Sequence, residues 1–196
     1  RFDAIRGNIS EIKTLASLCG TQEKNSGNMA VSDTMDVEKI TDKSDHCGKI
    51  TGIDGSGRGV DADNADTVTE ENLAQHISNA KMLSKKLQTI VAITGAIDLV
   101  TDGSSCYVIR NGNPQMGHVT GAGCQLSGIL TAFLAANPEN KLQAAAAAVC
   151  MMGYAGELAA EKSGQSGSGT YRVSLMDAVS CMDGDILERG ARYEIR

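Results

Sequence analysis

The run Thr89-Ile90-Val91-Ala92-Ile93 is short and almost entirely apolar. A run of this kind is typical of a β-strand that is covered on both faces. Apolar residues at helical spacing precede it over residues 70–87, and Thr69 is a candidate N-cap for that helix. Two more short strands are predicted after it, over residues 97–101 and 106–110. The middle of the chain therefore alternates between helix and strand.

The flanking segments continue this alternation. Before the run, the first residues resemble the end of a buried strand, and a helix is predicted over residues 10–18. After it, Asn111-Gly112-Asn113-Pro114 is a strong turn signal that we expect to form the tip of a hairpin. The elements predicted beyond this turn are two helices (125–136 and 141–161), a last strand (171–175) and two short closing helices (177–182 and 185–191). Alternating helices and buried strands predict an α/β fold with a largely parallel sheet.

Length and composition narrow the classes of function. The 196 residues suit one domain, and a content of 41% hydrophobic and 21% charged residues predicts a packed core. A net charge of −6 with only two Phe, four Tyr and no Trp argues against nucleic-acid binding. No apolar run approaches the roughly 20 residues of a membrane span, and the six cysteines form no C-x-x-C pair. We therefore expect a cytoplasmic protein with reduced thiols that binds neither nucleic acid nor membrane.

The negative charge comes from one stretch of the chain. Residues 21–72 hold eight Asp and four Glu against four Lys and one Arg, and no apolar period runs through them. A stretch of this composition buries too little apolar surface to offset its ordering entropy. We predict a surface insertion at about residues 21–67. A functional lid is the alternative, because long loops are either functional or disordered.

The segment Val119-Thr120-Gly121-Ala122-Gly123-Cys124 carries the strongest chemical signal. A strand that enters a G-x-G turn and then a helix gathers unpaired backbone N–H groups at the positive end of a helix dipole. Glycine leaves room for an anion to reach those groups. On spacing alone, a tight turn without a ligand is an equal alternative. Cys124 lies in the first helical turn, where a thiol pKa is lowered, although a buried structural cysteine is the commoner case.

Three segments of the chain share one resemblance. They are Ile5-Arg6-Gly7-Asn8-Ile9-Ser10-Glu11-Ile12, then residues 92–103, and then Asn111 to Pro114 followed by Val119 to Cys124. In order and spacing they resemble the hydroxyethylthiazole kinases, the thiamine-salvage members of the ribokinase-like superfamily, and Gly169 to Val173 also fits. The resemblance implies a three-layer α/β sandwich with a largely parallel central sheet that lacks its N-terminal strands. Residues 1–196 would form the C-terminal part of a single kinase domain.

The resemblance also implies a reaction, the Mg²⁺-assisted transfer of the γ-phosphoryl group of ATP to the hydroxyl of 4-methyl-5-(2-hydroxyethyl)thiazole. Cys124 takes the position of the catalytic base, and Gly121 that of a thiazole contact. The implied nucleotide contacts are Arg6, Asn8, Thr94, Gly95, Ala122 and Gly123, and Glu11 is the candidate Mg²⁺ ligand. Arginine suits phosphate oxygens, and a carboxylate suits Mg²⁺. On the residues alone, a surface ion pair for Arg6 and a solvated position for Glu11 are the ordinary alternatives.

The family pattern includes an N-terminal portion that these 196 residues lack. We therefore expect the chain by itself to be inactive and to expose an unpaired sheet edge. The resemblance further implies a homotrimer, and fungal members suggest a thiamine-phosphate synthase domain fused upstream. Two other functions stay open. One is a hydroxymethylpyrimidine (phosphate) kinase of the same superfamily, which shares the G-x-G-C turn, and the other is a non-catalytic regulatory domain that retains the fold.

Overall fold

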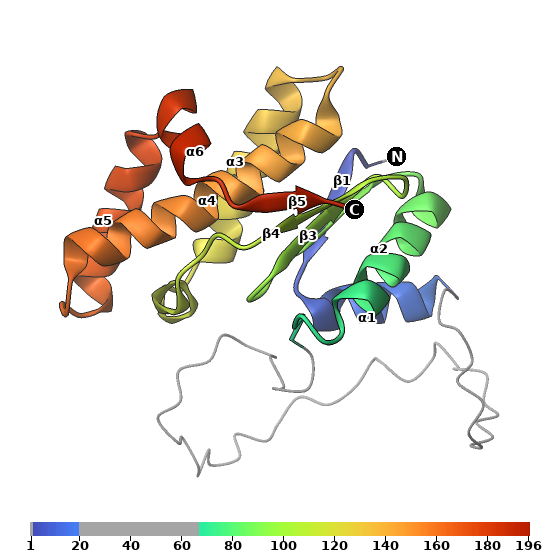
Figure 1. Cartoon of the computed structure of the whole chain (residues 1–196), viewed down its shortest axis with the longest axis horizontal. Coiled ribbons are helices and arrows are strands. Elements are labelled where there is room, and N and C mark those ends of the chain that lie inside the picture. The colour runs from blue at the N-terminus through green and yellow to red at the C-terminus, as the bar shows by residue number, and fades with distance from the viewer. Residues whose placement is uncertain (1, 20–66) are drawn as a thin grey trace, which may run out of the picture.

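The computed structural model of the protein describes residues 2–19 and 67–196, which form a five-stranded sheet with helices on both faces (Figure 1). The strands are β1 (Ala4–Gly7), β2 (Ile90–Ile93), β3 (Asp98–Thr101), β4 (Cys106–Ile109) and β5 (Tyr193–Ile195), side by side in this order. The predicted α/β class is confirmed. The predicted acidic insertion lies outside the described residues, apart from Thr67.

The directions of the strands differ from the expectation. Strand β1 pairs with β2 in parallel, whereas β2 with β3, β3 with β4 and β4 with β5 are all antiparallel. The prediction of a largely parallel sheet is therefore wrong for the described strands. Parallel neighbours need a crossover of about a dozen residues or more. Residues 94–97 and 102–105, which join β2 to β3 and β3 to β4, are too short for one.

Two hydrophobic cores lie on the two faces of the sheet. The helices are α1 (Ile9–Leu18), α2 (Leu73–Leu87), the 3₁₀ helix η3 (Pro114–His118), α3 (Ala122–Ala136), α4 (Lys141–Ser163), α5 (Ser168–Ser180) and α6 (Gly184–Gly190). Val91 and Ile93 of β2 pack with α1 and α2, while Ala92 packs with α3, α4 and α5. Successive side chains of a strand point to opposite faces. The prediction that β2 is covered on both faces is confirmed.

Helix α4 is the central helix of the larger core. Nearly all of the alanine run 144–148 is buried, which confirms the expected close approach of helix and sheet. Gly153 on α4 lies directly against the backbone of Asn111, because a Cβ at Gly153 would come within 2.6 Å of the Asn111 carbonyl oxygen. By length and composition α4 could cross a membrane, yet 67% of that apolar window is buried inside the protein. It is therefore accounted for as a core helix.

Helix α5 replaces two predicted elements. Residues 171–175 are not a strand and residues 177–182 do not begin a separate helix, since both belong to α5 or its C-terminal turn. Tyr171, Ser174 and Leu175 are buried at helical spacing, and the Tyr171 hydroxyl donates to the carbonyl oxygen of Gly156 at 3.0 Å. The aromatic and branched residues that suggested a strand are thus used to pack one helix on another. The short edge strand β5 has no counterpart in the sequence prediction.

Two local predictions also fail. The Asn111–Pro114 turn is not a hairpin tip, because the chain leaves β4 and enters η3, with Pro114 in its first turn and Asn113 as its N-cap. Thr69 does not cap α2. The N-cap position is occupied by Asn72, whose Oδ1 accepts a hydrogen bond from the Thr69 amide at 2.8 Å.

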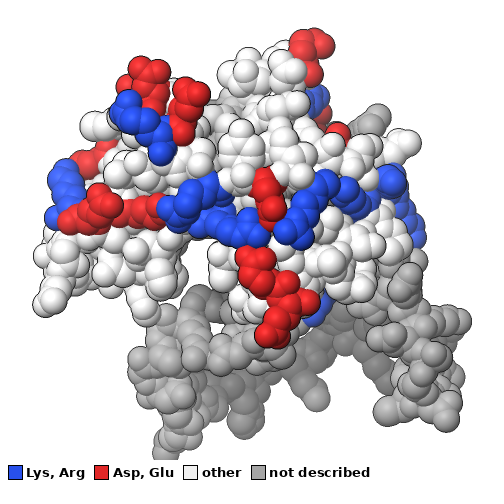
Figure 2. Space-filling view, in the orientation of Figure 1, with Lys and Arg blue, Asp and Glu red and all other residues white. Residues whose placement is uncertain are grey.

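Polar contacts attach the C-terminal segment to the rest of the fold. The C-terminal cluster consists of Asn111, Glu157 and Arg192, in which the Arg192 guanidinium donates to both Glu157 oxygens at 2.8 and 2.7 Å. Nearby, Arg110 donates to Glu70 at 2.9 Å and to Glu194 at 2.8 Å. Figure 2 shows basic and acidic side chains interleaved in a band over this face of the protein. Exposed pairs contribute little individually, but together they join β4, β5 and α4.

Candidate functional site

A pocket of about 560 Å³ opens where β1 and β2 end and α3 begins. Because β1 and β2 are parallel, their carboxyl ends lie at the same edge of the sheet. The remaining walls come from the segment after β4, from η3 and from α4. Five of the predicted site residues line this pocket, namely Arg6, Thr94, Gly95, Ala122 and Gly123. The structure therefore brings these five residues together, and their contact with a nucleotide stays a prediction.

Arg6 is the cation of this pocket. Its Nη1 donates to Thr94 Oγ1 at 3.3 Å, and its Nε is buried without a hydrogen-bond acceptor among the described residues. The guanidinium packs directly against the start of α3, because a Cβ on Gly123 would lie 3.2 Å from both Nη1 and Nη2. A buried donor without an acceptor is unusual in folded proteins. The arrangement leaves Arg6 with donor capacity for a ligand.

The N-terminus of α3 also presents unpaired donors. Gly121 is the N-cap, with φ of 91°, a left-handed conformation that glycine adopts without steric cost, and no side chain caps the helix. The Ala122 amide is already used, since it donates to the Val119 carbonyl oxygen at 3.2 Å. Within the described part of the chain, the amides of Gly123 and Cys124 have no acceptor. A 3₁₀ helix rather than the expected strand leads into this turn.

Cys124 and Gly121 lie at the same helix end but outside the pocket wall. Both residues are exposed, and neither is among those that line the pocket. Cys124 is thus not the buried structural cysteine of the ordinary alternative. Its thiol is accessible to a small molecule that approaches the beginning of α3.

Asn8 and Glu11 have a structural task at the beginning of α1. The Asn8 side chain accepts a hydrogen bond from the Glu11 amide at 2.8 Å, and Glu11 Oε2 accepts one from the Asn8 amide at 2.7 Å. This reciprocal capping box satisfies two backbone donors of the helix. Neither residue lines the pocket, and over residues 2–19 and 67–196 no group of three or more His, Cys, Asp and Glu could hold a metal ion.

Asp98 is a pocket residue that the sequence analysis did not single out. It is 9% exposed, and its Oδ1 accepts a hydrogen bond from the Gly95 amide at 2.8 Å. Burial raises the pKa of its carboxyl to about 7, while the Gly95 hydrogen bond and the Arg6 charge act in the opposite direction. An acid beside Ile97, Leu99 and Val100 in a predicted strand was the signal that could have identified it.

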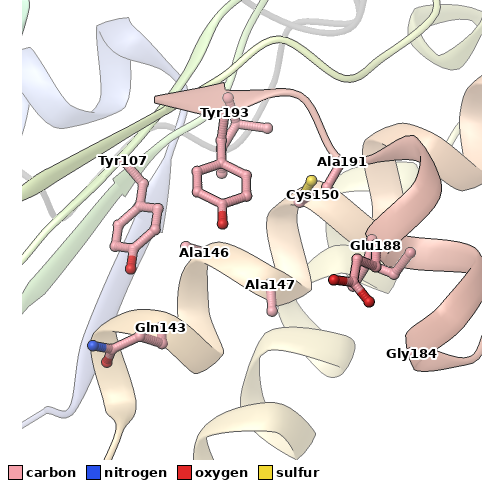
Figure 3. Close-up of a pocket in the computed structure, with 11 residues that line it drawn as sticks. Tyr107, Gln143, Ala146, Ala147, Cys150, Gly184, Glu188, Ala191 and Tyr193 are labelled. Atoms are coloured by element: carbon pink, nitrogen blue, oxygen red, sulfur yellow. The ribbon is translucent and has the colours of Figure 1, made fainter. Parts of the chain in front are cut away.

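A second pocket of about 540 Å³ lies between β4, β5, α4 and α6 (Figure 3). Tyr107 and Tyr193 stand side by side on its strand wall, with ring centroids 5.6 Å apart, and Glu188 lies on the opposite, helical wall. None of its lining residues is Lys, Arg or His, and none is a predicted site residue. A pocket whose charged lining residue is a carboxylate does not suit a phosphate. Because the first pocket holds Arg6 and four other predicted site residues, we take this Arg6 pocket as the candidate site.

Comparisons with known proteins identify the family of the chain. The family model described as "HK: Hydroxyethylthiazole kinase family" matches residues 31–185. A hydroxyethylthiazole kinase of Clostridium acetobutylicum is 40% identical over 99% of this chain and 59% of its own length. Hydroxyethylthiazole kinase 2 of Methanosphaera stadtmanae is 33% identical over 98% of this chain and 58% of its own length.

A solved structure supports the same relationship. The hydroxyethylthiazole kinase protein of Pyrococcus horikoshii superposes with a TM-score of 0.58 and 28% identity, over 65% of this chain and 48% of that one. The chain thus spans less than two thirds of the length of each of these relatives. With a family model over most of its residues and relatives at these identities, the chain belongs to the hydroxyethylthiazole kinase family.

Proposed function

We propose that the protein transfers the γ-phosphoryl group of ATP to the hydroxyl of 4-methyl-5-(2-hydroxyethyl)thiazole, as in thiamine salvage. Membership of the family supports this class of reaction. The observation that carries it is the Arg6 guanidinium, packed against the first turn of α3 with a buried Nε that has no acceptor in residues 2–19 and 67–196. Such a cation is an appropriate partner for phosphate oxygens.

The pocket would hold the triphosphate by combining charge with backbone donors. Arg6 supplies a permanent positive charge, and the Gly123 and Cys124 amides point out from the positive end of the α3 dipole. Thr94 and Gly95 at the end of β2 would contact the nucleotide from the other wall. Phosphoryl transfer depends mainly on positioning and on neutralising charge at the transferring oxygens. These residues offer both.

The acceptor alcohol would approach the exposed side of the α3 N-terminus. There Gly121 provides backbone surface without a side chain, and the Cys124 thiol is within the first helical turn. We propose that Cys124 orients the hydroxyl and accepts part of its proton. Because the transition state of phosphoryl transfer is loose, full deprotonation before transfer is not required.

Glu11 fits the requirements of a Mg²⁺ ligand in one respect. One of its carboxylate oxygens bonds to the Asn8 amide, but the side chain is exposed and its other oxygen can still face a cation. Magnesium prefers carboxylate, water and phosphate oxygens as ligands. Commonly only one of these ligands is a protein carboxylate. Bound there, the ion would neutralise charge on the triphosphate. Asn8, whose side chain caps α1, would contribute by holding Glu11 in place.

Membership of the family is also the basis for proposals on the fold, the cellular location, the oligomeric state and a fusion partner. We propose a ribokinase-like sandwich in which the acidic residues at about 21–67 are a surface insertion of a single kinase domain. On the same basis we propose a cytoplasmic homotrimer, with a thiamine-phosphate synthase domain as a fusion partner. The helices on both faces of the sheet are consistent with such a sandwich.

A competition assay tests the proposed reaction. The whole protein that contains these residues is given ATP, Mg²⁺ and the thiazole alcohol, with hydroxymethylpyrimidine as competitor, and both phosphorylated products are measured. We expect thiazole phosphate to predominate. Predominant pyrimidine phosphorylation would favour the related kinase. Failure to bind either alcohol or ATP would favour a regulatory domain.

A further inference from the structure

Asp98 lines the Arg6 pocket and has no role in the proposed reaction. It begins β3, directly after the connection 94–97, and its Oδ1 holds the Gly95 amide at 2.8 Å. This bond closes the turn that presents Thr94 to Arg6. The carboxyl is therefore placed where it can fix the geometry of one wall and also alter the charge that a ligand meets.

Arg6 and Asp98 are the ionisable side chains among the residues that line this pocket. Arg6 faces Asp98 from β1, and the Cys150 thiol on α4 is within range of its charge. On the sheet, β2 has no ionisable side chain, and the β4 residue paired with Asp98 is Ile109. An ionised Asp98 would therefore have Arg6 as its counter-charge. A bound polyphosphate would compete for the same guanidinium.

Two anions that share one cation in a buried site raise each other's proton affinity. Repulsion between a triphosphate and the Asp98 carboxylate is relieved when the carboxyl is neutral. We propose that Asp98 is a positioning residue of the nucleotide pocket, which holds the Thr94–Gly95 turn and takes up a proton when a polyphosphate binds beside Arg6. This inference rests on the proposed nucleotide role of the pocket.

A calorimetric measurement tests proton uptake without a variant. A non-hydrolysable ATP analogue is titrated into the protein at pH 8, in two buffers that differ in ionisation enthalpy. At this pH the phosphates are ionised, because their second pKa is about 6. The Asp98 carboxyl, with a pKa of about 7 in the ligand-free protein, is mostly ionised too. We expect net uptake of a fraction of a proton on binding, and binding without any uptake overturns the inference.

The variant Asp98→Asn keeps the oxygen that accepts from Gly95 and removes the charge. Between pH 6 and pH 8.5 the affinity of the unaltered protein for the analogue should fall on the order of tenfold more than that of the variant, since each unit of pKa shift is worth a factor of ten. Asp102→Asn is the matched control. Asp102 also braces a turn, with Oδ1 accepting from the Ser104 and Ser105 amides at 2.8 and 2.9 Å, but it is exposed at the other end of β3.

The outcomes distinguish the proposed role of Asp98 from the proposed binding of a nucleotide in the pocket. Loss of the pH dependence in Asp98→Asn and its retention in Asp102→Asn support the inference. Equal pH dependence in the unaltered protein and Asp98→Asn overturns it, while nucleotide binding itself still stands. If the analogue does not bind at any pH, both the inference and the proposed nucleotide role are overturned.

Discussion

The Arg6 pocket and the C-terminal cluster both contain buried polar groups, yet they differ in how those groups are paired. Asn111 makes four hydrogen bonds with its side chain: Nδ2 donates to Glu157 Oε1 and the Gly190 carbonyl, and Oδ1 accepts from the Arg192 amide and the Cys150 thiol. The Arg6 side chain donates to Thr94 at 3.3 Å and has a buried Nε without an acceptor in the described residues.

This difference separates a structural cluster from a candidate binding site. A saturated cluster stabilises the fold, because removing any member leaves its partners buried and unpaired. An unsaturated one contributes less to stability and keeps donors available for a ligand. The same comparison predicts which substitutions should harm binding and which should harm folding.

The largest effect is expected for Arg6→Met. The change removes the permanent charge of the pocket and should lower the affinity for ATP on the order of a hundredfold or more. The free energy of unfolding should change by no more than about 1 kcal/mol, since few bonds are lost. Binding calorimetry and urea denaturation measure the two quantities. Arg172→Met, on the exposed side of α5, is the control. Unaltered affinity in Arg6→Met would remove Arg6 from the site.

A loss of stability is the effect expected for Asn111→Ala, whose residue also lines the Arg6 pocket. Loss of this buried side chain leaves polar groups of Glu157, Gly190 and Arg192 without their partner and should destabilise the protein by about 3 kcal/mol. Urea denaturation provides the measurement. Asn137→Ala, which removes one exposed hydrogen bond to the Phe133 carbonyl, should cost about 0.5 kcal/mol or less. Equal losses in the two variants would contradict a saturated cluster at Asn111.

A smaller effect on catalysis is expected for Cys124→Ser. If the thiol accepts part of the proton of the alcohol, turnover should fall on the order of tenfold to a hundredfold with ATP affinity unchanged. Cys124→Asp should retain activity, because a carboxylate is ionised at neutral pH. Steady-state kinetics of the whole protein, with the exposed Cys181→Ser as control, give the answer. An unaffected serine variant would exclude the base role.

The smallest effect is expected for Gly123→Ala, which tests how closely the start of α3 packs on Arg6. In Gly123→Ala the new Cβ would lie 3.2 Å from both terminal nitrogens of Arg6, so the guanidinium must move slightly. A few-fold loss of ATP affinity is expected, measured by calorimetry. Gly128→Ala on the same helix meets open space and should leave affinity unchanged while stabilising α3 by about 0.5–1 kcal/mol. Parallel behaviour of the two variants would show that Arg6 does not depend on Gly123.

Local sequence signals predicted elements whose own residues suffice to define them. Strand β2 was recognised from its apolar run, and α1 and α2 from their helical spacing. The segment 171–175 misled the prediction, because Tyr and Val favour strands in isolation. Its helical conformation depends on contact with α4, and the Tyr171 hydroxyl bond to Gly156 spans two helices. Tertiary packing overrides a weak local preference in such a case.

The residues of the candidate site also divide into those that the sequence indicated and those that it did not. Arg6, Thr94 and Gly123 were selected because their segments resemble a known family, and the structure brings all three to one pocket. Asn8 and Glu11 carried an equally clear pattern, but that pattern also describes a capping box, and this is the contact they make. Asp98 was missed, because its importance comes from Arg6 and Gly95, which it meets only in the folded chain.

Taken by itself, the sequence determined the α/β class, the apolar strand buried on both faces and the glycine turn at the start of α3. These follow from periodicity and from backbone freedom, which act over a few neighbouring residues. Tertiary structure alone decided the antiparallel order of β2 to β5, the saturation of Asn111 and the burial of the Arg6 Nε without an acceptor among the described residues. Those properties depend on which residues, far apart in the sequence, come together and exclude water. The local pattern of the sequence does not specify these contacts.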